Sequence, residues 1–274
     1  MSIANRRILP GFQLSLGYTV LYLSLLVLIP LCACFLKAST LSIEDFIRAV
    51  WTPRARAAYA LTFGASFVAA IVDMVLGLLV AWVLVRYEFP FKRFFDSLID
   101  LPFALPTAVA GLVYSQLYVK NGWLGQFLVP MGIQAAYSRL GIVLVLIFIG
   151  LPFVVRTLQP VLESLDVELE EAAECLGATR WQTFQRVLFP PLIPAMLTGF
   201  ALTFARAIGE YGSVMFVSSN KVMETEIAPL LIVYRLDDFK YAEAAAIAVV
   251  LLVISFALLG VINALERWSQ SYAS

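Results

Sequence analysis

The sequence predicts an all-α, polytopic membrane protein with six transmembrane helices. Of its 274 residues, 61% are hydrophobic and 14% are charged, whereas a typical soluble domain is about 25% charged. The apolar residues gather in runs of roughly 20, the length that a helix needs to cross a bilayer. No segment alternates apolar and polar residues as the strands of a membrane barrel do. We expect one membrane domain that takes in residues 1–274.

The six spans are placed on the longest apolar runs. They are Phe12–Leu36, Tyr59–Val85, Leu98–Val119, Leu140–Leu158, Leu192–Val217 and Ala242–Leu265. Arg6 and Arg7 precede the first run, as in a signal peptide, but no convincing cleavage site follows and we interpret the run as a retained span. A short amphipathic helix is expected at Leu41–Val50. The loop Val222–Tyr241 contains an apolar run, Ile227–Tyr234, that is too short to span.

A polar island, residues 161–190, separates the fourth and fifth spans. Six acidic residues and no basic residue lie between Glu163 and Glu174, and apolar residues recur there at helical spacing from Leu162 to Leu176. An amphipathic helix beside a membrane usually lies on lipid, but helices that bind the anionic inner leaflet carry Lys and Arg on the polar face. Because this helix has the opposite charge, we favour docking on a protein over docking on lipid.

The polar island is predicted to form a helix–turn–helix. Gly177 suits the position just past a helix end, where φ is usually positive. Thr179 and Gln182 have the spacing of a capping box that starts a second short helix, and Trp181 gives that helix an apolar side. Pro190 is expected to end the second helix and open the fifth span.

Among the ionisable residues inside the predicted spans, each of which costs about 2.5–3.5 kcal/mol to insert, three stand out near the middle of a span. Arg206 and Glu210 lie near the middle of the fifth span, one helical turn apart. They could be a mutually neutralising pair that stabilises packing or a polar lining of the translocation path. We favour the path, because the Arg guanidinium is a fixed cation that suits oxyanions. Asp73, alone among apolar neighbours in the second span, is interpreted as a helix–helix hydrogen-bonding group.

Prolines and small residues also mark two of the spans. Pro102 and Pro106 open the third span and deny backbone donors. This stretch is either a tolerated Pro-rich helix start or an irregular segment beside the translocation path. In the fifth span, small residues recur every three to four positions and would let backbones approach closely, within a central helix or at an oligomer contact. They are Ala201, Ala205, Gly209 and Gly212.

The polar island resembles the coupling loop of ABC importer permeases. That family pattern is Glu-Ala-Ala, three residues, Gly, nine residues, Ile, one residue, Leu-Pro. The matching positions are Glu171, Ala172, Ala173, Gly177 and Pro190, with Val187 and Phe189 in place of the Ile and the Leu. The resemblance implies that this loop, including Trp181, inserts into a cleft on a separate ATPase subunit.

Further runs narrow the resemblance to the sulfate/thiosulfate ABC importer permeases. They are DLPFALPTAVAGL, LPFVVRTLQPVLE, TFARAIGEYGSV and TEIAPLLIVYRL, and the opening RRILPGF is similar to the T-type of the two paralogous permeases. The resemblance implies the type I ABC importer permease fold. It also implies a complex with a paralogous second permease, two copies of an ATPase subunit and an extracytoplasmic sulfate/thiosulfate-binding protein. Molybdate and tungstate permeases share much of this pattern, so another tetrahedral oxyanion stays open as the substrate.

The resemblance also decides the orientation in the bacterial plasma (inner) membrane. Lys and Arg are divided evenly between the two sides of the predicted topology, so the positive-inside rule is a tie. The coupling loop must face the cytoplasm, where ATP is. Both termini are then cytoplasmic.

No chemistry of its own is expected in this chain. It has no His, and we interpret Cys32, Cys34 and Cys175 as packing residues because their spacing is unlike that of metal ligands. No Walker A pattern occurs, so ATP and Mg²⁺ are expected at the partner ATPase, with no cofactor, metal or catalytic residue here. The net charge of zero argues against a nucleic-acid partner.

Two rival interpretations stay open. A secondary transporter or channel would need no ATPase, but it would leave the acidic helix and its glycine break without a purpose. A membrane enzyme would need a catalytic cluster, and the sequence offers no nucleophile–base pair.

Overall fold

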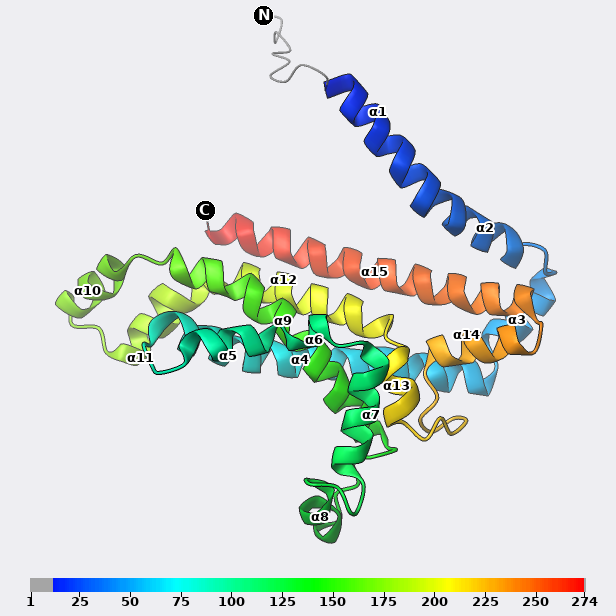
Figure 1. Cartoon of the computed structure of the whole chain (residues 1–274). Coiled ribbons are helices and arrows are strands. Elements are labelled where there is room, and N and C mark those ends of the chain that lie inside the picture. Colours follow the sequence, from blue (N-terminus) through cyan, green and yellow to red (C-terminus); the bar gives the residue numbers. More distant parts are fainter. Residues whose placement is uncertain (1–11, 274) are drawn as a thin grey trace, which may run out of the picture.

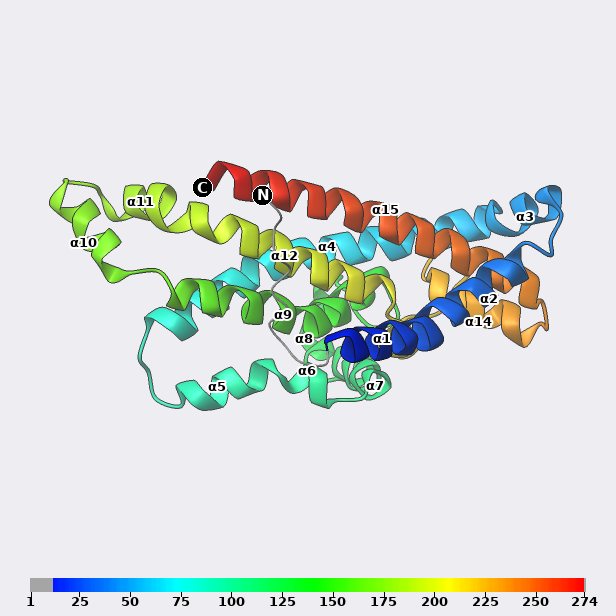
Figure 2. The ribbon, with the colours of Figure 1, turned by 90° about the horizontal axis from the view of Figure 1, so that it is seen from above.

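Four long helices form the body of the protein. The computed structural model describes residues 12–273, with the side chains of residues 12 and 14–265. The helices α4 (Pro53–Arg86), α9 (Arg139–Glu163), α12 (Phe189–Ile208) and α15 (Tyr241–Ala273) lie side by side (Figures 1 and 2). Within residues 12–273 the structure has helices and no strands, as the composition predicts.

Five helical segments of the described chain are long and apolar enough to cross a membrane. They are Leu14–Ala38, Pro53–Arg86, Arg139–Glu163, Arg180–Ile208 and Tyr241–Leu265. Each overlaps one predicted span, which leaves the third predicted span without such a helix. The residues of the RRILPGF run before Phe12 lie outside the described chain.

The third predicted span, Leu98–Val119, is broken rather than continuous. It is divided among α5 (Lys92–Ile99), α6 (Leu101–Ala104) and α7 (Thr107–Tyr118). Leu105 and Pro106 have extended backbone, with ψ of 133° and 131°, because a proline lacks the N–H of the helix and pushes the residue before it out of the α region. After this break, α7 and α8 (Gly125–Leu128) point away from the four long helices (Figure 1).

The fifth predicted span also differs at both ends. The helix α12 ends at Ile208, and residues 209–211 separate it from α13 (Gly212–Val217), so the predicted end at Val217 is wrong. At the other end, α11 (Arg180–Thr183), the π-helical turn η3 (Phe184–Leu188) and α12 form one helical segment. Pro190 therefore does not end a helix. It lies in the first turn of α12, and the preceding π turn, with its wider hydrogen bonds, accommodates the missing N–H.

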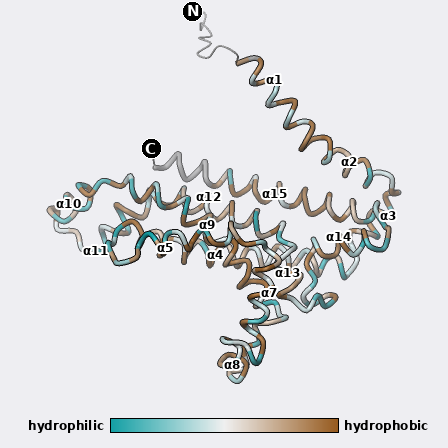
Figure 3. The backbone as a smooth tube through the Cα atoms, viewed as in Figure 1, coloured by the Kyte–Doolittle hydropathy of each residue, from teal (hydrophilic) through white to brown (hydrophobic). Residues whose placement is uncertain are grey.

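The N-terminal helical segment leaves the bundle. It consists of α1 (Phe12–Leu23), the π turn η1 (Ser24–Leu28) and α2 (Ile29–Ala38). Within this segment α2 packs on α15, whereas the largely hydrophobic α1 diverges from the other helices (Figures 1 and 3).

The two short elements expected outside the spans are both helical. They are α3 (Ile43–Val50), which confirms the amphipathic helix, and α14 (Ala228–Asp237), which contains the short apolar run. Both lie at one end of the bundle, and α10 (Val167–Cys175) and α11 lie at the other (Figure 1).

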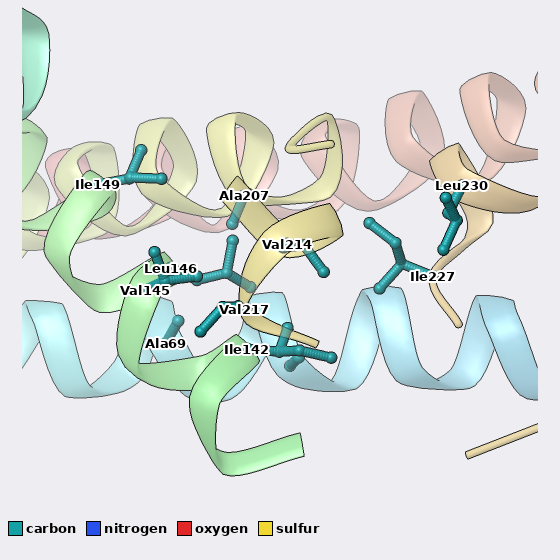
Figure 4. Close-up of a cluster of buried hydrophobic side chains, with 11 residues drawn as sticks. Ala69, Ile142, Val145, Leu146, Ile149, Ala207, Val214, Val217, Ile227 and Leu230 are labelled. Atoms are coloured by element: carbon teal, nitrogen blue, oxygen red, sulfur yellow. The ribbon is translucent and has the colours of Figure 1, made fainter. Parts of the chain in front are cut away.

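A buried apolar cluster joins α4 and α9 to the segments that follow the break in α12 (Figure 4). Its labelled members are Ala69, Ile142, Val145, Leu146, Ile149, Ala207, Val214, Val217, Ile227 and Leu230. Within a bilayer such a cluster is stabilised by close packing rather than by removal from water. It fixes α13 and α14 against the long helices.

Candidate functional site

The polar island forms the predicted helix–turn–helix. Gly177 has a φ of +78°, and its N–H donates to the carbonyl of Glu174 at 2.9 Å. The Thr179 hydroxyl accepts from the N–H of Gln182 at 3.3 Å, and the Gln182 side chain accepts from the N–H of Thr179 at 2.8 Å. The glycine turn and the capping box are thus confirmed, and they set the angle between α10 and α11.

The apolar side chains of this loop face outward. Leu176 is 88% exposed and Trp181 is 63% exposed, and the Trp181 ring stacks on Phe184 with centroids 5.7 Å apart. The predicted apolar stripe belongs to two elements, because Leu162 is buried at the end of α9, whereas Leu169 is exposed on α10. Exposed large apolar groups in a fixed, capped turn are typical of a protein–protein contact.

The Glu-Ala-Ala residues lie in the middle of α10. Glu171 and Ala172 are exposed, whereas Ala173 is the buried residue of the helix. Among the acids of this loop, Glu170 points back to the body of the protein, and its Oε1 lies 2.7 Å from Nη1 of Arg86 in the last turn of α4. Arg86 also lies over the ring of Trp82, 5.5 Å from its centroid.

Besides its chain connection to α9, the polar island is joined to two further long helices. The Arg86–Glu170 ion pair connects it to α4, and the unbroken helical segment from α11 connects it to α12. A force on α10 would reach both helices. Arg86 is a functional residue that was not predicted from the sequence, although its position at the end of a span was an available signal.

Arg206 and Glu210 form the predicted pair, but they lie at the end of α12 rather than in the middle of a continuous span. Nη1 of Arg206 is 2.6 Å from Oε2 of Glu210. Oε1 of Glu210 accepts from both the N–H and the hydroxyl of Ser213, each at 2.9 Å. The Glu210 side chain is 3% exposed and that of Arg206 is 34% exposed. Glu210 thus caps α13 and holds Arg206, which keeps part of its surface open.

The two helix breaks lie against each other. A Cβ on Gly212 would overlap the hydroxyl of Thr107, the residue after Pro106, and a Cβ on Gly111 would overlap the carbonyl of Ser213. The helices α7 and α13 accordingly pack closely, as small residues allow.

The structure therefore brings Pro106 near the Arg206–Glu210 pair. Pro102 lies in the first turn of α6, on the same broken stretch. Of the small residues predicted for close packing, Gly212 and Ala201 are buried or in close contact, whereas Ala205 and Gly209 are exposed beside Arg206.

A second arginine network was missed in the sequence. Arg156 of α9 donates to Asp96 at 2.7 Å and to Asp100 at 2.9 and 2.5 Å, and it also donates to Gln159 at 2.7 Å. Partial burial by itself would raise the pKa of Asp96, but hydrogen bonds from Gln159 and Arg156, and the charges of Arg156 and Lys92, lower it overall. The ionised network holds α5 and α6 on α9, just before the break at Pro106.

A further ion pair lies near the start of α4. Nε and Nη2 of Arg54 donate to the carboxylate of Glu226 at 2.8 and 2.6 Å. The Glu226 side chain is 1% exposed. This bidentate pair ties the segment before α14 to the start of α4.

Other predicted residues have less defined places. Asp73 is fully buried, but neither of its oxygens has a hydrogen-bond partner among the described residues, so it does not form the predicted helix–helix hydrogen bond. Cys32 and Cys175 are exposed and do not pack in the core, and Cys34 is half-buried. Within the described chain, no group of three or more His, Cys, Asp or Glu residues could hold a metal ion.

Comparisons with known proteins identify the family of this chain. Residues 73–270 match the family model of the binding-protein-dependent transport system inner membrane component. The chain is 51% identical over 256 residues to the sulfate transport system permease protein CysT of Synechocystis sp., covering 93% of this chain and 90% of the relative. It is 47% identical over 265 residues to the Escherichia coli protein of the same name, covering 97% of this chain and 96% of the relative.

Two kinds of solved transporter share the fold. A bacterial ABC transporter involved in the import of alginate aligns with a TM-score of 0.75 at 18% identity, covering 93% of this chain and 94% of that chain. A chain of the MetNI methionine ABC transporter aligns with a TM-score of 0.56 at 18% identity, covering 83% and 97%.

Proposed function

Because the chain belongs to the family of binding-protein-dependent transport system inner membrane components, we propose that it is the permease subunit of an ATP-driven ABC importer for sulfate and thiosulfate. We infer the substrate from the relatives, which are sulfate transport system permeases that are 47–51% identical to this chain over nearly its whole length. The protein is a multi-pass membrane protein with its long helices across the bilayer.

The observation that carries the proposal is the loop formed by α10, the turn at Gly177 and α11, which we call the docking loop. Leu176 and Trp181 are exposed on a turn whose shape is set by Gly177 and the capping box. We propose that this turn inserts into a separate ATPase subunit, which binds ATP and Mg²⁺ on the cytoplasmic side. Glu171 and Ala172 would lie in the contact, the buried Ala173 would hold α10 against its own chain, and both termini would then also be cytoplasmic.

Closure of two ATPase copies would move α10 and α11 together. The Arg86–Glu170 ion pair would pass this motion to α4, and the continuous helix through Pro190 would pass it to α12. The far end of α12 carries Arg206 and the break at residues 209–211. Motion at the docking loop is thereby connected to the position of the one cation on α12.

We propose that the translocation path runs past Arg206 and the broken stretch from Pro102 to Pro106. The open side of Arg206 offers a cation, and its exposed neighbours Ala205 and Gly209 are small. Glu210 neutralises part of that charge, which keeps the attraction for a divalent anion weak enough for release. The paralogous second permease would complete the path, and an extracytoplasmic binding protein would deliver the anion.

The test is reconstitution of the chain with the second permease, the ATPase and the binding protein in proteoliposomes. We expect uptake of radiolabelled sulfate that requires ATP and is competed by thiosulfate more strongly than by molybdate. Uptake without the ATPase would indicate a secondary transporter. Stronger competition by molybdate would assign the other oxyanion.

A further inference from the structure

A carboxyl group without a partner lies at the centre of the bundle. Asp73 is in the middle of α4, it is 0% exposed, and neither of its oxygens has a hydrogen-bond partner among the described residues. Buried carboxylates in proteins are normally paired with a cation or accept several hydrogen bonds.

The site of Asp73 is built by three helices. A Cβ on Gly150 of α9 would overlap Oδ2 of Asp73 and would lie 2.5 Å from the Cγ2 methyl of Thr203 on α12. The hydroxyl of Thr203 does not serve Asp73, because it donates to the carbonyl of Gly150 at 3.1 Å. The missing side chain of Gly150 thus makes room for a carboxyl group at the point where α4, α9 and α12 cross.

No cation of the surrounding helices is free to neutralise this carboxyl. The arginines of α4, α9 and α12 are engaged as follows: Arg54 with Glu226, Arg56 with the Trp51 ring, Arg86 with Glu170, Arg139 with the carbonyl of Glu224, Arg156 with Asp96 and Asp100, and Arg206 with Glu210. From α7, the titratable group near enough to sense the charge of Asp73 is Tyr114, which is itself an acid.

We propose that Asp73 is a proton-binding site: its carboxyl is protonated while α4, α9 and α12 are packed as here, and it releases the proton in any conformation that opens this crossing to water. A neutral acid is tolerated in a dry site without donors, whereas a carboxylate there has neither a counter-charge nor hydration. A proton site at this crossing is separate from the import of an anion and does not depend on which anion is carried.

The consequence is a pH dependence of helix packing. The packed crossing holds one proton, whereas a hydrated Asp carboxyl, whose ordinary pKa is about 3.9, has already lost its proton at neutral pH. Raising the pH therefore favours the opened crossing, by up to about tenfold in the equilibrium constant for each pH unit. A transporter whose helices α4 and α12 move relative to one another would sense pH through this residue.

Infrared difference spectroscopy of the assembled transporter tests the protonation directly. We expect the wild-type complex at neutral pH to show the carbonyl-stretch band of a protonated carboxyl that is absent from Asp73→Asn. The control, Asp237→Asn, removes an exposed acid and should leave that band unchanged. Identical spectra for the wild type and Asp73→Asn would show that Asp73 is ionised, and the proposal would fall.

A second measurement follows the thermal unfolding of the same complexes across neutral pH. The wild type should lose stability relative to Asp73→Asn as the pH rises, since unfolding then releases a proton that the variant lacks. Asp73→Ser, which is also neutral and is smaller, serves if the Asn variant does not assemble. A stability difference that stays constant with pH would contradict the proposal, whether or not sulfate is the substrate.

Discussion

The Arg206–Glu210 pair allows the role of Arg206 in transport to be separated from its role in packing. In Arg206→Met, the buried Glu210 carboxylate loses the guanidinium at 2.6 Å but keeps two Ser213 donors at 2.9 Å. Breaking a buried ion pair on one side costs about 3–5 kcal/mol. We expect roughly 2–3 kcal/mol here, because two donors remain and Arg206 is partly exposed.

A second change in the same background should recover the fold. Glu210→Gln removes the stranded charge, and the amide oxygen of Gln can still accept both hydrogen bonds from Ser213. Glu210→Leu would remove the charge as well, but it would also remove the cap of α13, at about 1 kcal/mol. The double variant Arg206→Met with Glu210→Gln is therefore the appropriate one.

The assay is radiolabelled sulfate uptake in proteoliposomes, normalised to the amount of assembled complex, together with the thermal midpoint of each variant. We expect the double variant to assemble with near wild-type stability and to lose most uptake, because no neutral side chain replaces the attraction of a cation for a divalent anion. Arg48→Met, which removes an exposed arginine on α3, should transport normally. Wild-type uptake by the double variant would reduce Arg206 to a packing residue.

Three further substitutions probe the docking loop and the helix breaks. Gly177→Val should uncouple ATP hydrolysis from uptake. Gly132 has a φ of +81°, close to the +78° of Gly177, so Gly132→Val should carry the same backbone strain of about 1–2 kcal/mol but leave coupling intact. Equal effects of the two substitutions on coupling would refute a special role for the docking loop. Trp181→Ala should weaken binding of the ATPase, measured by co-purification, by up to about 3 kcal/mol. Trp123→Ala should leave binding unchanged, although Trp123 is 73% exposed and Trp181 is 63% exposed; a larger loss of binding in Trp123→Ala would show that the ATPase does not contact Trp181. Gly111→Ala should destabilise the complex by about 1–3 kcal/mol, because its Cβ meets a backbone carbonyl of α13 that cannot move aside; an unchanged thermal midpoint would show that α7 and α13 are not in close contact.

Local chemistry explains what the sequence could predict. The hydropathy of long apolar runs is enough to place five helical segments across the membrane, because a helix in lipid satisfies its own backbone and needs no partner for this. The turn between α10 and α11 was equally predictable. Gly177, Thr179 and Gln182 act on backbone groups within three residues of themselves.

Tertiary contacts decided the features that hydropathy does not report. Residues on both sides of the breaks in α6–α7 and α12–α13 are apolar, so a hydropathy pattern continues through Pro106 although the helix does not. Arg156 and its acceptors Asp96 and Asp100 are 56 to 60 residues apart, and neither side of the pair shows in the sequence which partner it will meet. Asp73 likewise looked like a hydrogen-bonding residue until its helix was packed. Whether a polar group in the membrane has a partner depends on the neighbouring helices, and only the packed bundle determines which helices those are.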